Sequence, residues 1–277
     1  MSSRACPREK IYFVVNEKHL FKKWPELVSE PRPFAPDECP ERIISGRDCW
    51  IILTWARLCA VDCPFDPVLS CRSVDNAVCV FHWDDATPAQ GVHRCFAVVA
   101  QADRPRPALS DMTVMQNGLM GETGLRRTMP HWPQPGLIPR DPARGDRLET
   151  IAYFGSDQYE PQFVKTGAFQ DALRQRGVRF VNRFQGEWHD YQHVDAVLDS
   201  IDRLQQESGL YRRMTEHGAK RAQAFDVNML TQKWISLLEE ARERNRRETL
   251  HPVMRSIRYL WNRQKINLGK RLSGWRD

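Results

Sequence analysis

The sequence contains no long hydrophobic run. Nowhere in its 277 residues do about 18 apolar residues follow one another without interruption, as a membrane-spanning helix would require. The apolar run nearest the N-terminus, Ile11–Val15, has only five residues, too few for the core of a signal peptide. We therefore expect a cytoplasmic protein with no transmembrane helix.

Common ligand-binding motifs are also lacking. The sequence has no G-x-G-x-x-G pattern, no Walker A pattern and no C-x-x-C pair, which are signatures of dinucleotide, nucleotide and zinc sites. Cysteines do occur, all in the first third, at Cys6, Cys39, Cys49, Cys59, Cys63, Cys71, Cys79 and Cys95. Their spacings match no common zinc pattern, and several lie in apolar runs, where a thiol behaves as a small hydrophobe. We expect buried free thiols and no bound metal.

The sequence is nevertheless rich enough in apolar residues to fold. Hydrophobic residues make up 41% and charged residues 27%, as in globular proteins, and the length suits one large domain or two modest ones. The net charge of +6 is unevenly distributed. Residues 241–277 hold eleven Lys or Arg and three acids, a net charge of +8, which leaves −2 for the other 240 residues.

This basic tail has a second property. Val253, Ile257, Leu260 and Trp261 recur in it at helical spacing, the pattern of an amphipathic helix attracted to anionic lipid. The tail thus predicts an anionic membrane surface as a partner, with peripheral attachment at the inner membrane face. A solvated tail and a helix packed on the N-terminal part of the chain are the alternatives. No nucleic-acid motif accompanies the charge, so no nucleic-acid partner is expected.

Short β-rich apolar runs dominate the first half of the chain. They are typical of strands buried on both faces, and we expect an α/β fold with a mainly parallel sheet. The predicted strands are Lys10–Asn16, Cys49–Thr54, Asn76–His82, Cys95–Ala100 and Met112–Gln116. A helix is expected within His19–Val28.

A proline-rich stretch then interrupts the pattern. PHWPQPGLIPRD (130–141) excludes a helix and a central strand and has the chemistry of a stiff linker. A second α/β pattern follows, with strands at Leu148–Phe154 and Val178–Phe184, and Val194–Leu198 as either a third strand or the start of a helix. The predicted domains are an N-terminal lobe over 1–130, a linker over 131–147, a second lobe over 148–240 and a basic tail over 241–277.

Polar residues at the expected strand ends are the candidate site. His82, Asp84 and Asp85 follow one strand directly. Ligands of open parallel sheets bind outside the carboxyl ends of the strands, so these side chains could supply a general base; a capping loop is the alternative. Gln116 and Asn117 follow another strand, although Asn-Gly is also a turn dipeptide.

Two further candidates come from the second half of the chain. Gly155 and Ser156 end a predicted strand, where a glycine lets the backbone approach a phosphate; a plain strand-to-loop glycine is the alternative. In the proline-rich stretch, His131 could line a cleft or could pack within a rigid linker, and Arg140 lies at its far end.

Together these segments resemble bacterial GT-B-type glycosyltransferases of family 1 or family 4. The similarity covers most of residues 75–240, and its most specific part is PHWPQPGLIPRD followed by YFG. The segments that carry it are HRCFAVVAQADRPRP, MTVMQN, PHWPQPGLIPRDPARGDRLETIAYFG, GVRFVNRFQGEWHDYQHVDAVL and LYRRMTEHGAKRAQAFDVNMLTQKWISLLEE.

The resemblance implies two Rossmann-like lobes facing each other across a cleft. The N-terminal lobe would hold a glycan or lipid-linked acceptor near His82, Asp84 and Asp85. The second lobe would hold a nucleotide-diphosphate sugar near Gly155 and Ser156, with Gln116, Asn117, His131 and Arg140 along the cleft. No metal or other cofactor is implied, because positive side chains and helix dipoles stabilise the departing diphosphate in such enzymes.

The sequence departs from the family after residue 198. Similar enzymes continue with a segment rich in Lys, Asn and Gly and then a Gly-Pro-Glu-like loop, which hold the donor phosphates and ribose. This chain passes directly to DSIDRLQQESGLYRRM (199–214). The expected function is sugar transfer in the synthesis of a cell-surface glycan. The alternative is a catalytically inactive, glycosyltransferase-like binding or scaffold protein.

Overall fold

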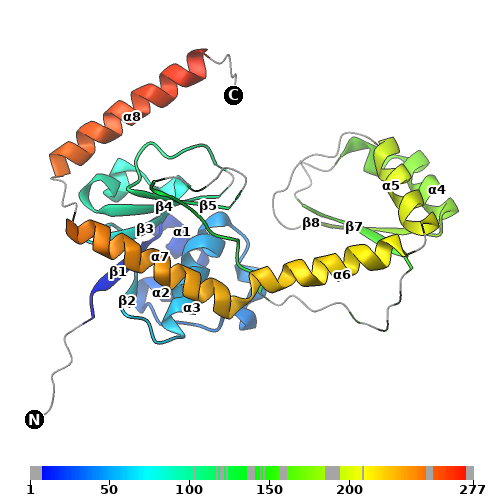
Figure 1. Ribbon diagram of the computed structural model, residues 1–277, viewed down its shortest axis with the longest axis horizontal. Helices are drawn as coiled ribbons and strands as arrows, with labels where there is room; N and C mark the ends of the chain where they lie inside the picture. Colours follow the sequence, from blue (N-terminus) through cyan, green and yellow to red (C-terminus); the bar gives the residue numbers. More distant parts are fainter. Residues whose placement is uncertain are drawn as a thin grey trace, which may run out of the picture. The chain divides into compact units, whose positions relative to one another are not determined.

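The protein folds into two compact units. The computed structural model describes residues 8–102, 104–116, 118, 122, 124–135, 141, 143, 145, 147–155, 161–184, 194–207, 209–247 and 252–272. One unit comprises Met1–Gly136 together with Phe225–Asp277, and the other comprises Leu137–Ala224 (Figure 1). The chain therefore leaves the first unit near its midpoint and returns to it.

A six-stranded parallel sheet forms the centre of the first unit. Its strand order is β2-β1-β3-β4-β5-β6, and every adjacent pair is parallel. The strands are β1 (Lys10–Val14), β2 (Asp66–Ser70), β3 (Val78–His82), β4 (Phe96–Ala102), β5 (Met112–Met115) and β6 (Arg126–Thr128). The expected α/β class with a parallel sheet is confirmed.

One face of this sheet carries the larger core. Ile11, Phe13, Val80 and Val98 lie on it and belong to one buried apolar cluster. The helices that contribute to the same cluster are α1 (Glu17–Lys23), α2 (Pro25–Ser29), α3 (Leu53–Cys59) and α7 (Val227–Arg247). The expected helix within residues 19–28 is thus two short helices, because Pro25 cannot continue the first of them and starts the second.

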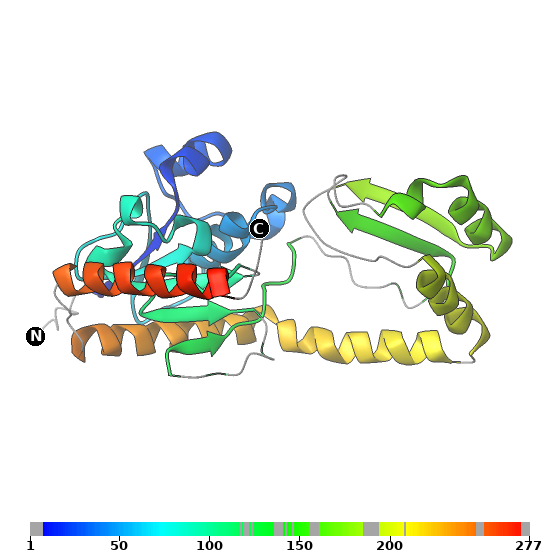
Figure 2. The same cartoon turned by 90° about the horizontal axis from the view of Figure 1, so that it is seen from above.

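The opposite face of the sheet has a separate cluster. Alternate residues of the same strands, among them Val14, Phe81 and Val99, are buried there, as the two-residue period of a strand requires. Short 3₁₀ turns between β3 and β4 cover this face, and Tyr259 of α8 (Pro252–Leu272) packs against it. Figure 2 shows α7 and α8 as separate long helices within this unit.

The expected strand at Cys49–Thr54 is wrong. Those residues form a π-helical turn (Asp48–Ile52) that continues into α3. Side chains are buried on every side of it, from Cys49 through Leu58. A fully buried helix and a fully buried strand both read as an unbroken apolar run, so the apolar pattern alone does not separate them.

The start of the proline-rich stretch packs into the first unit. Trp132 is buried, and its indole Nε1 donates a hydrogen bond to Oγ1 of Thr54 at 2.8 Å. The amide Nε2 of Gln134 donates to the carbonyl of Ile43 at 2.9 Å. Residues 131–135 therefore belong to the first unit and its core, and the expected linker over 131–147 starts too early.

The second unit is smaller. Two parallel strands, β7 (Thr150–Gly155) and β8 (Arg179–Phe184), form its sheet, and its helices are α4 (Gly167–Gln175), α5 (Val194–Gln206) and α6 (Leu210–Ala222). Of the two alternatives for residues 194–198, the helix is the correct one. The unit has its own apolar cluster, which includes Leu148, Phe169 and Leu173.

The second unit ends at Ala224, earlier than the expected boundary at residue 240. The reason is the apolar stripe of α7, in which Leu230, Trp234, Leu238 and Ala241 are buried in the core of the first unit. Asp226 caps this helix by accepting a hydrogen bond from the amide of Met229 at 2.9 Å. No described helix is both long enough and apolar enough to cross a membrane.

Truncating Trp132 tests whether the proline-rich stretch is part of the core. We expect Trp132→Ala to lower the free energy of unfolding of the first unit by about 3–5 kcal/mol, because it removes a buried indole and leaves a cavity. Tryptophan fluorescence in urea reports this unit selectively, since eight of the nine tryptophans, all except Trp188, belong to it.

Phe21→Ala is the matched control, because the Phe21 ring is 57% exposed and its loss is expected to change stability by less than about 0.5 kcal/mol. Equal unfolding midpoints for the two variants would show that residues 131–135 act only as a linker.

Candidate functional site

The strand order of the sheet reverses direction between β1 and β3. From β1 the chain moves to β2 on one side, and from β3 it proceeds to β4, β5 and β6 on the other. The carboxyl ends of β1 and β3 therefore flank the switch point, where open parallel sheets bind their ligands. Asn16 follows β1 and His82 ends β3, so the expected site at His82, Asp84 and Asp85 lies at this point.

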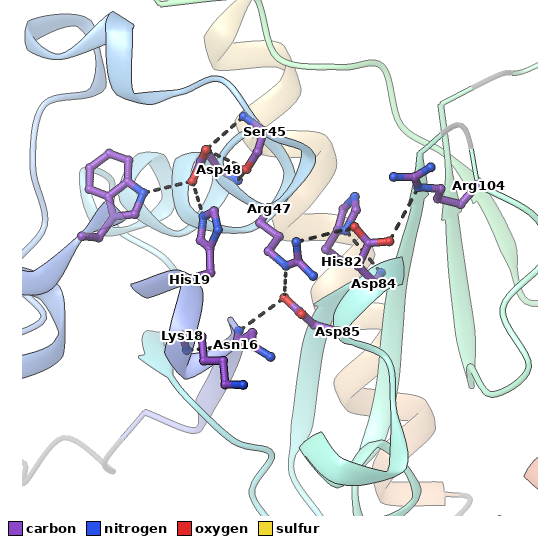
Figure 3. Close-up of polar contacts among 11 residues, drawn as sticks. Asn16, Lys18, His19, Ser45, Arg47, Asp48, His82, Asp84, Asp85 and Arg104 are labelled. Carbon is purple, nitrogen blue, oxygen red and sulfur yellow. Dashed lines mark hydrogen bonds and ion pairs between the residues drawn. The ribbon is translucent and has the colours of Figure 1, made fainter. Parts of the chain in front are cut away.

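His82 and Asp84 form a contact pair there (Figure 3). A 3₁₀ turn over Trp83–Asp85 folds the chain back directly after β3. The amide of Asp84 donates a hydrogen bond to Nδ1 of His82 at 3.3 Å, and the carboxylate Oδ2 of Asp84 lies 3.4 Å from the same nitrogen. Contact with His82, supported by Arg47 and Arg104, holds the pKa of Asp84 below its ordinary value despite partial burial. The carboxylate is therefore ionised at neutral pH.

Asp85 is buried and paired with Arg47. Its Oδ2 accepts hydrogen bonds from Nε of Arg47 at 2.8 Å and from the amide of Asn16 at 3.3 Å. Within the described part of the chain, Oδ1 of Asp85 is buried and has no hydrogen-bond partner. Burial by itself lowers the pKa of Arg47, but the bond to Asp85 and its charge outweigh this and raise that pKa. The pair ties the start of one helix to the ends of β1 and β3.

Arg47 also reaches the first carboxylate of the turn. Its Nη1 lies 3.6 Å from Oδ2 of Asp84, and Nε of Arg104 lies 3.6 Å from the other oxygen, Oδ1. Arg104 follows β4, the next strand of the sheet. Two guanidinium groups thus face two carboxylates at the switch point, so the cluster is close to neutral.

A buried carboxylate fixes the helix from which Arg47 projects. Both Asp48 and Ser45 take part in a reciprocal cap, in which Asp48 accepts from the amide and hydroxyl of Ser45 at 3.0 and 2.7 Å. The amide of Asp48 in turn donates to Oγ of Ser45 at 3.3 Å. Such a capping box satisfies backbone donors at a helix start.

The other oxygen of the Asp48 carboxylate faces α1 and α2. His19 Nε2 lies 2.7 Å from it and Trp24 Nε1 donates to it at 3.0 Å. Burial alone raises the pKa of Asp48, but the hydrogen bonds of His19, Ser45 and Trp24 outweigh burial and lower it. The network therefore keeps a charged group in the interior and fixes the position of neighbouring Arg47.

The helix start approaches His82 closely. A Cβ added at Gly46 would lie 2.4 Å from Nε2 of His82, a distance that no larger residue can adopt without displacing the ring. His82 is only 3% exposed. A glycine is required at this position because the backbone of the helix start packs directly on the imidazole edge.

The structure does not bring the remaining predicted residues into this cluster. Gln116 follows β5 and is half-buried, and Gly155 ends β7 in the second unit. Asn117, Arg140 and Ser156 lie outside the described residues. Among the described residues, no group of His, Cys, Asp or Glu side chains is arranged to hold a metal ion.

His131 has a packing role. Its ring lies 5.2 Å from that of Trp50, nearly perpendicular to it. Its Nδ1 donates to the carbonyl of Trp132 at 2.7 Å. Burial lowers the pKa of His131 and outweighs the opposite effect of that hydrogen bond, so the imidazole is neutral at neutral pH. Of the two alternatives for this residue, packing is the one its contacts support.

Sequence reasoning missed the residues that hold the site in place. These are Asn16, His19, Gly46, Arg47, Asp48 and Arg104. One signal was available, because Ser45 and Asp48 have the spacing of a capping box directly before an apolar run. The signal predicts a helix there in place of a strand, and with it an arginine in the first turn.

Replacing Asp48 tests the buried network through its pH dependence. The folded-state pKa lies below the ordinary value near 3.9, so the carboxylate stabilises the fold above about pH 5, and this contribution is lost as the pH falls through the folded pKa. We expect Asp48→Asn to lower stability at pH 7 by about 2–3 kcal/mol. The deficit should shrink markedly by pH 3, as measured by urea unfolding.

Asp62→Asn is the control, because Asp62 is an exposed carboxylate and its variant should follow the wild type at both pH values. A deficit for Asp48→Asn that is the same at pH 7 and pH 3 would contradict a charged Asp48 in the folded protein.

The comparisons with known proteins add no further guide to the site. No protein-family model, no curated protein and no solved structure matches the chain. The geometry of the switch-point cluster, formed by His82, Asp84, Asp85, Arg47 and Arg104, is therefore the basis for assigning a function.

Proposed function

We propose that the chain is a glycosyltransferase that moves a sugar from a nucleotide-diphosphate sugar to a saccharide or lipid-linked acceptor. The observation that carries the proposal is the contact between His82 and Asp84 at the switch point of a parallel sheet. The resemblance of residues 75–240 to GT-B-type enzymes is the support for the proposed substrate class. A two-lobed, GT-B-like organisation is part of the same proposal, supported by the second α/β unit with a core of its own.

His82 is the proposed base of an inverting transfer. In the structure Nδ1 of His82 accepts the amide hydrogen of Asp84. The proposed base uses the other tautomer, in which Nδ1 carries a proton that it donates to the adjacent carboxylate of Asp84 and Nε2 keeps its lone pair. Nε2 would take the proton of the acceptor hydroxyl while that oxygen bonds to the anomeric carbon and the bond to the diphosphate breaks. The ionised Asp84 would stabilise the imidazolium that forms.

Asp85 and the two arginines have supporting roles in this proposal. The buried pair of Asp85 and Arg47 positions the turn that holds Asp84. Arg104 is exposed and pairs with Asp84, and its guanidinium is the proposed contact for an anionic group of the substrate. Gly155 and Ser156 are the proposed donor-side residues, because the backbone at Gly155, which has no side chain, can approach a phosphate.

A specific observation favours the alternative, a catalytically inactive binding or scaffold protein. His82 is almost fully buried and Gly46 packs on its Nε2 edge, so an acceptor reaches the base only if the helix start at Gly46 moves aside. The sequence also lacks the segment that holds the donor in similar enzymes. The experiment must therefore measure binding and turnover separately.

The test uses the full chain with UDP-glucose, UDP-N-acetylglucosamine and GDP-mannose at millimolar concentration. Thermal shift measures binding, and release of free UDP or GDP measures hydrolysis, with water in the place of the acceptor. We expect His82→Gln to lower the hydrolysis rate at least about 100-fold, the usual contribution of a general base, while the thermal shift persists. His93→Gln, which changes a histidine of the β3–β4 connection, is the matched control and should retain the wild-type rate.

Each outcome has a distinct meaning. A thermal shift without turnover by the wild type would support the binding protein and overturn the transferase. The absence of any nucleotide-induced shift would overturn both versions. Full turnover by His82→Gln would leave a transferase but remove His82 as its base.

A further inference from the structure

The last described helix, α8, has two faces with different environments. On its inner side, the guanidinium of Arg255 is buried and contacts the carboxylate of Asp111 and the carbonyl of Cys95. One turn later, Tyr259 packs against the apolar cluster on the second face of the sheet. These contacts fix which side of α8 faces the protein.

The opposite side of α8 is an exposed apolar stripe. Six of the ten large hydrophobic side chains exposed in the described part of the chain lie on this one helix. At 100° per residue their directions fall within about 60° on either side of Ile257, roughly opposite Arg255 and Tyr259. The stripe consists of Val253, Met254, Ile257, Leu260, Trp261 and Leu268, each between 53% and 59% exposed.

Positive charge borders this stripe. The α8 sequence has six Lys or Arg and no acidic residue. Arg258 and Lys265 lie on one flank of the stripe and Arg263 on the other, by the same geometry. The ammonium of Lys265 lies 5.2 Å from the centre of the Trp261 ring, so apolar and basic groups adjoin on the same surface.

The basic residues of α7 do not contribute to this surface. Arg242 and Arg246 are paired with Glu9, and Arg244 with Glu240. The strong charge of residues 241–277 is therefore partly neutralised in α7. On α8, Arg255 and Arg258 share Asp111, whereas Arg263 and Lys265, on opposite flanks of the stripe, lie outside these pairs. The sequence predicts membrane attachment through the whole tail, and the structure limits the candidate surface to one side of α8.

We propose that the outer face of α8 lies in the surface of a membrane that contains anionic lipid. The apolar stripe would enter the boundary between headgroups and acyl chains, and the basic flanks would contact anionic headgroups, as interfacial helices do. The inference does not depend on the proposed sugar transfer, since it concerns the opposite side of a helix that the site does not use.

The positive charge around the apolar stripe favours an anionic bilayer over a second copy of the chain or a nucleic acid as its partner. A second copy of this chain, related by two-fold symmetry, would bring two acid-free basic rims together. A nucleic acid would use the positive charge but leave the six apolar side chains in water. An anionic bilayer matches both the stripe and its flanks.

The test is co-sedimentation of the full chain with vesicles of phosphatidylcholine alone or with one quarter phosphatidylglycerol. We expect pelleting with the anionic vesicles, little with the neutral ones, and a decrease as salt rises. Ile257→Ser with Trp261→Ser should weaken binding at least about tenfold. Arg263→Gln with Lys265→Gln should weaken it by roughly tenfold or more.

Point variants are preferable to truncation, because removing α8 would leave the buried Asp111 without Arg255. Two matched controls carry the same types of change on α1. Phe21→Ser alters an apolar side chain of similar exposure, and Lys22→Gln with Lys23→Gln removes two exposed charges. Both controls should bind anionic vesicles like the wild type, and circular dichroism confirms that all variants fold.

Three results would overturn the proposal. The first is equal pelleting with neutral and anionic vesicles. The second is wild-type binding by both α8 variants. The third is a dimer in light scattering that the double serine variant converts to monomer, because the stripe would then be the interface of a second copy.

Discussion

A charged carboxylate in the protein interior organises the first unit. Asp48 has no exposed side-chain surface, and an isolated charge there would be costly. Four groups of Ser45, His19 and Trp24 contact it, which joins a helix start to the two helices after β1. Gly46 and Arg47 lie between the capping residues, so the same network sets how closely the helix meets His82 and where Arg47 reaches Asp85. The candidate site depends on an interaction that no substrate would touch.

Much of the fold could be predicted from local pattern. The strands at β1, β3, β4 and β5 follow from apolar, β-branched runs of strand length, and their burial on both faces explains why strict alternation is absent. The edge strands β2 and β6 escaped prediction for the opposite reason. β2 contains Pro67 and β6 is largely polar. An edge strand tolerates both, because it needs fewer backbone donors and less apolar surface than a central strand.

The site was predictable only in part. His82, Asp84 and Asp85 follow a buried strand, so their position follows from the general behaviour of parallel sheets. Arg47 lies 38 residues before its partner Asp85, and no local signal connects the two. The assignment of Cys49–Thr54 to a strand hid this arginine, since a strand would have sent it away from the sheet edge. The contact between Arg47 and Asp85 is tertiary, and local pattern does not encode it, whereas the capping spacing of Ser45 and Asp48 was a local signal for the helix.

The return of the chain to the first unit has a consequence for synthesis on the ribosome. Leu230, Trp234 and Leu238, together with the other α7 residues of the cluster, complete a core whose remaining members all precede residue 133. About ninety residues of the second unit must therefore emerge before these side chains become available. During that interval the part of the core that α7 covers is exposed, the type of apolar surface that chaperones bind and that aggregates when left unprotected. Translation speed through residues 137–224 therefore sets how long the nascent protein remains vulnerable.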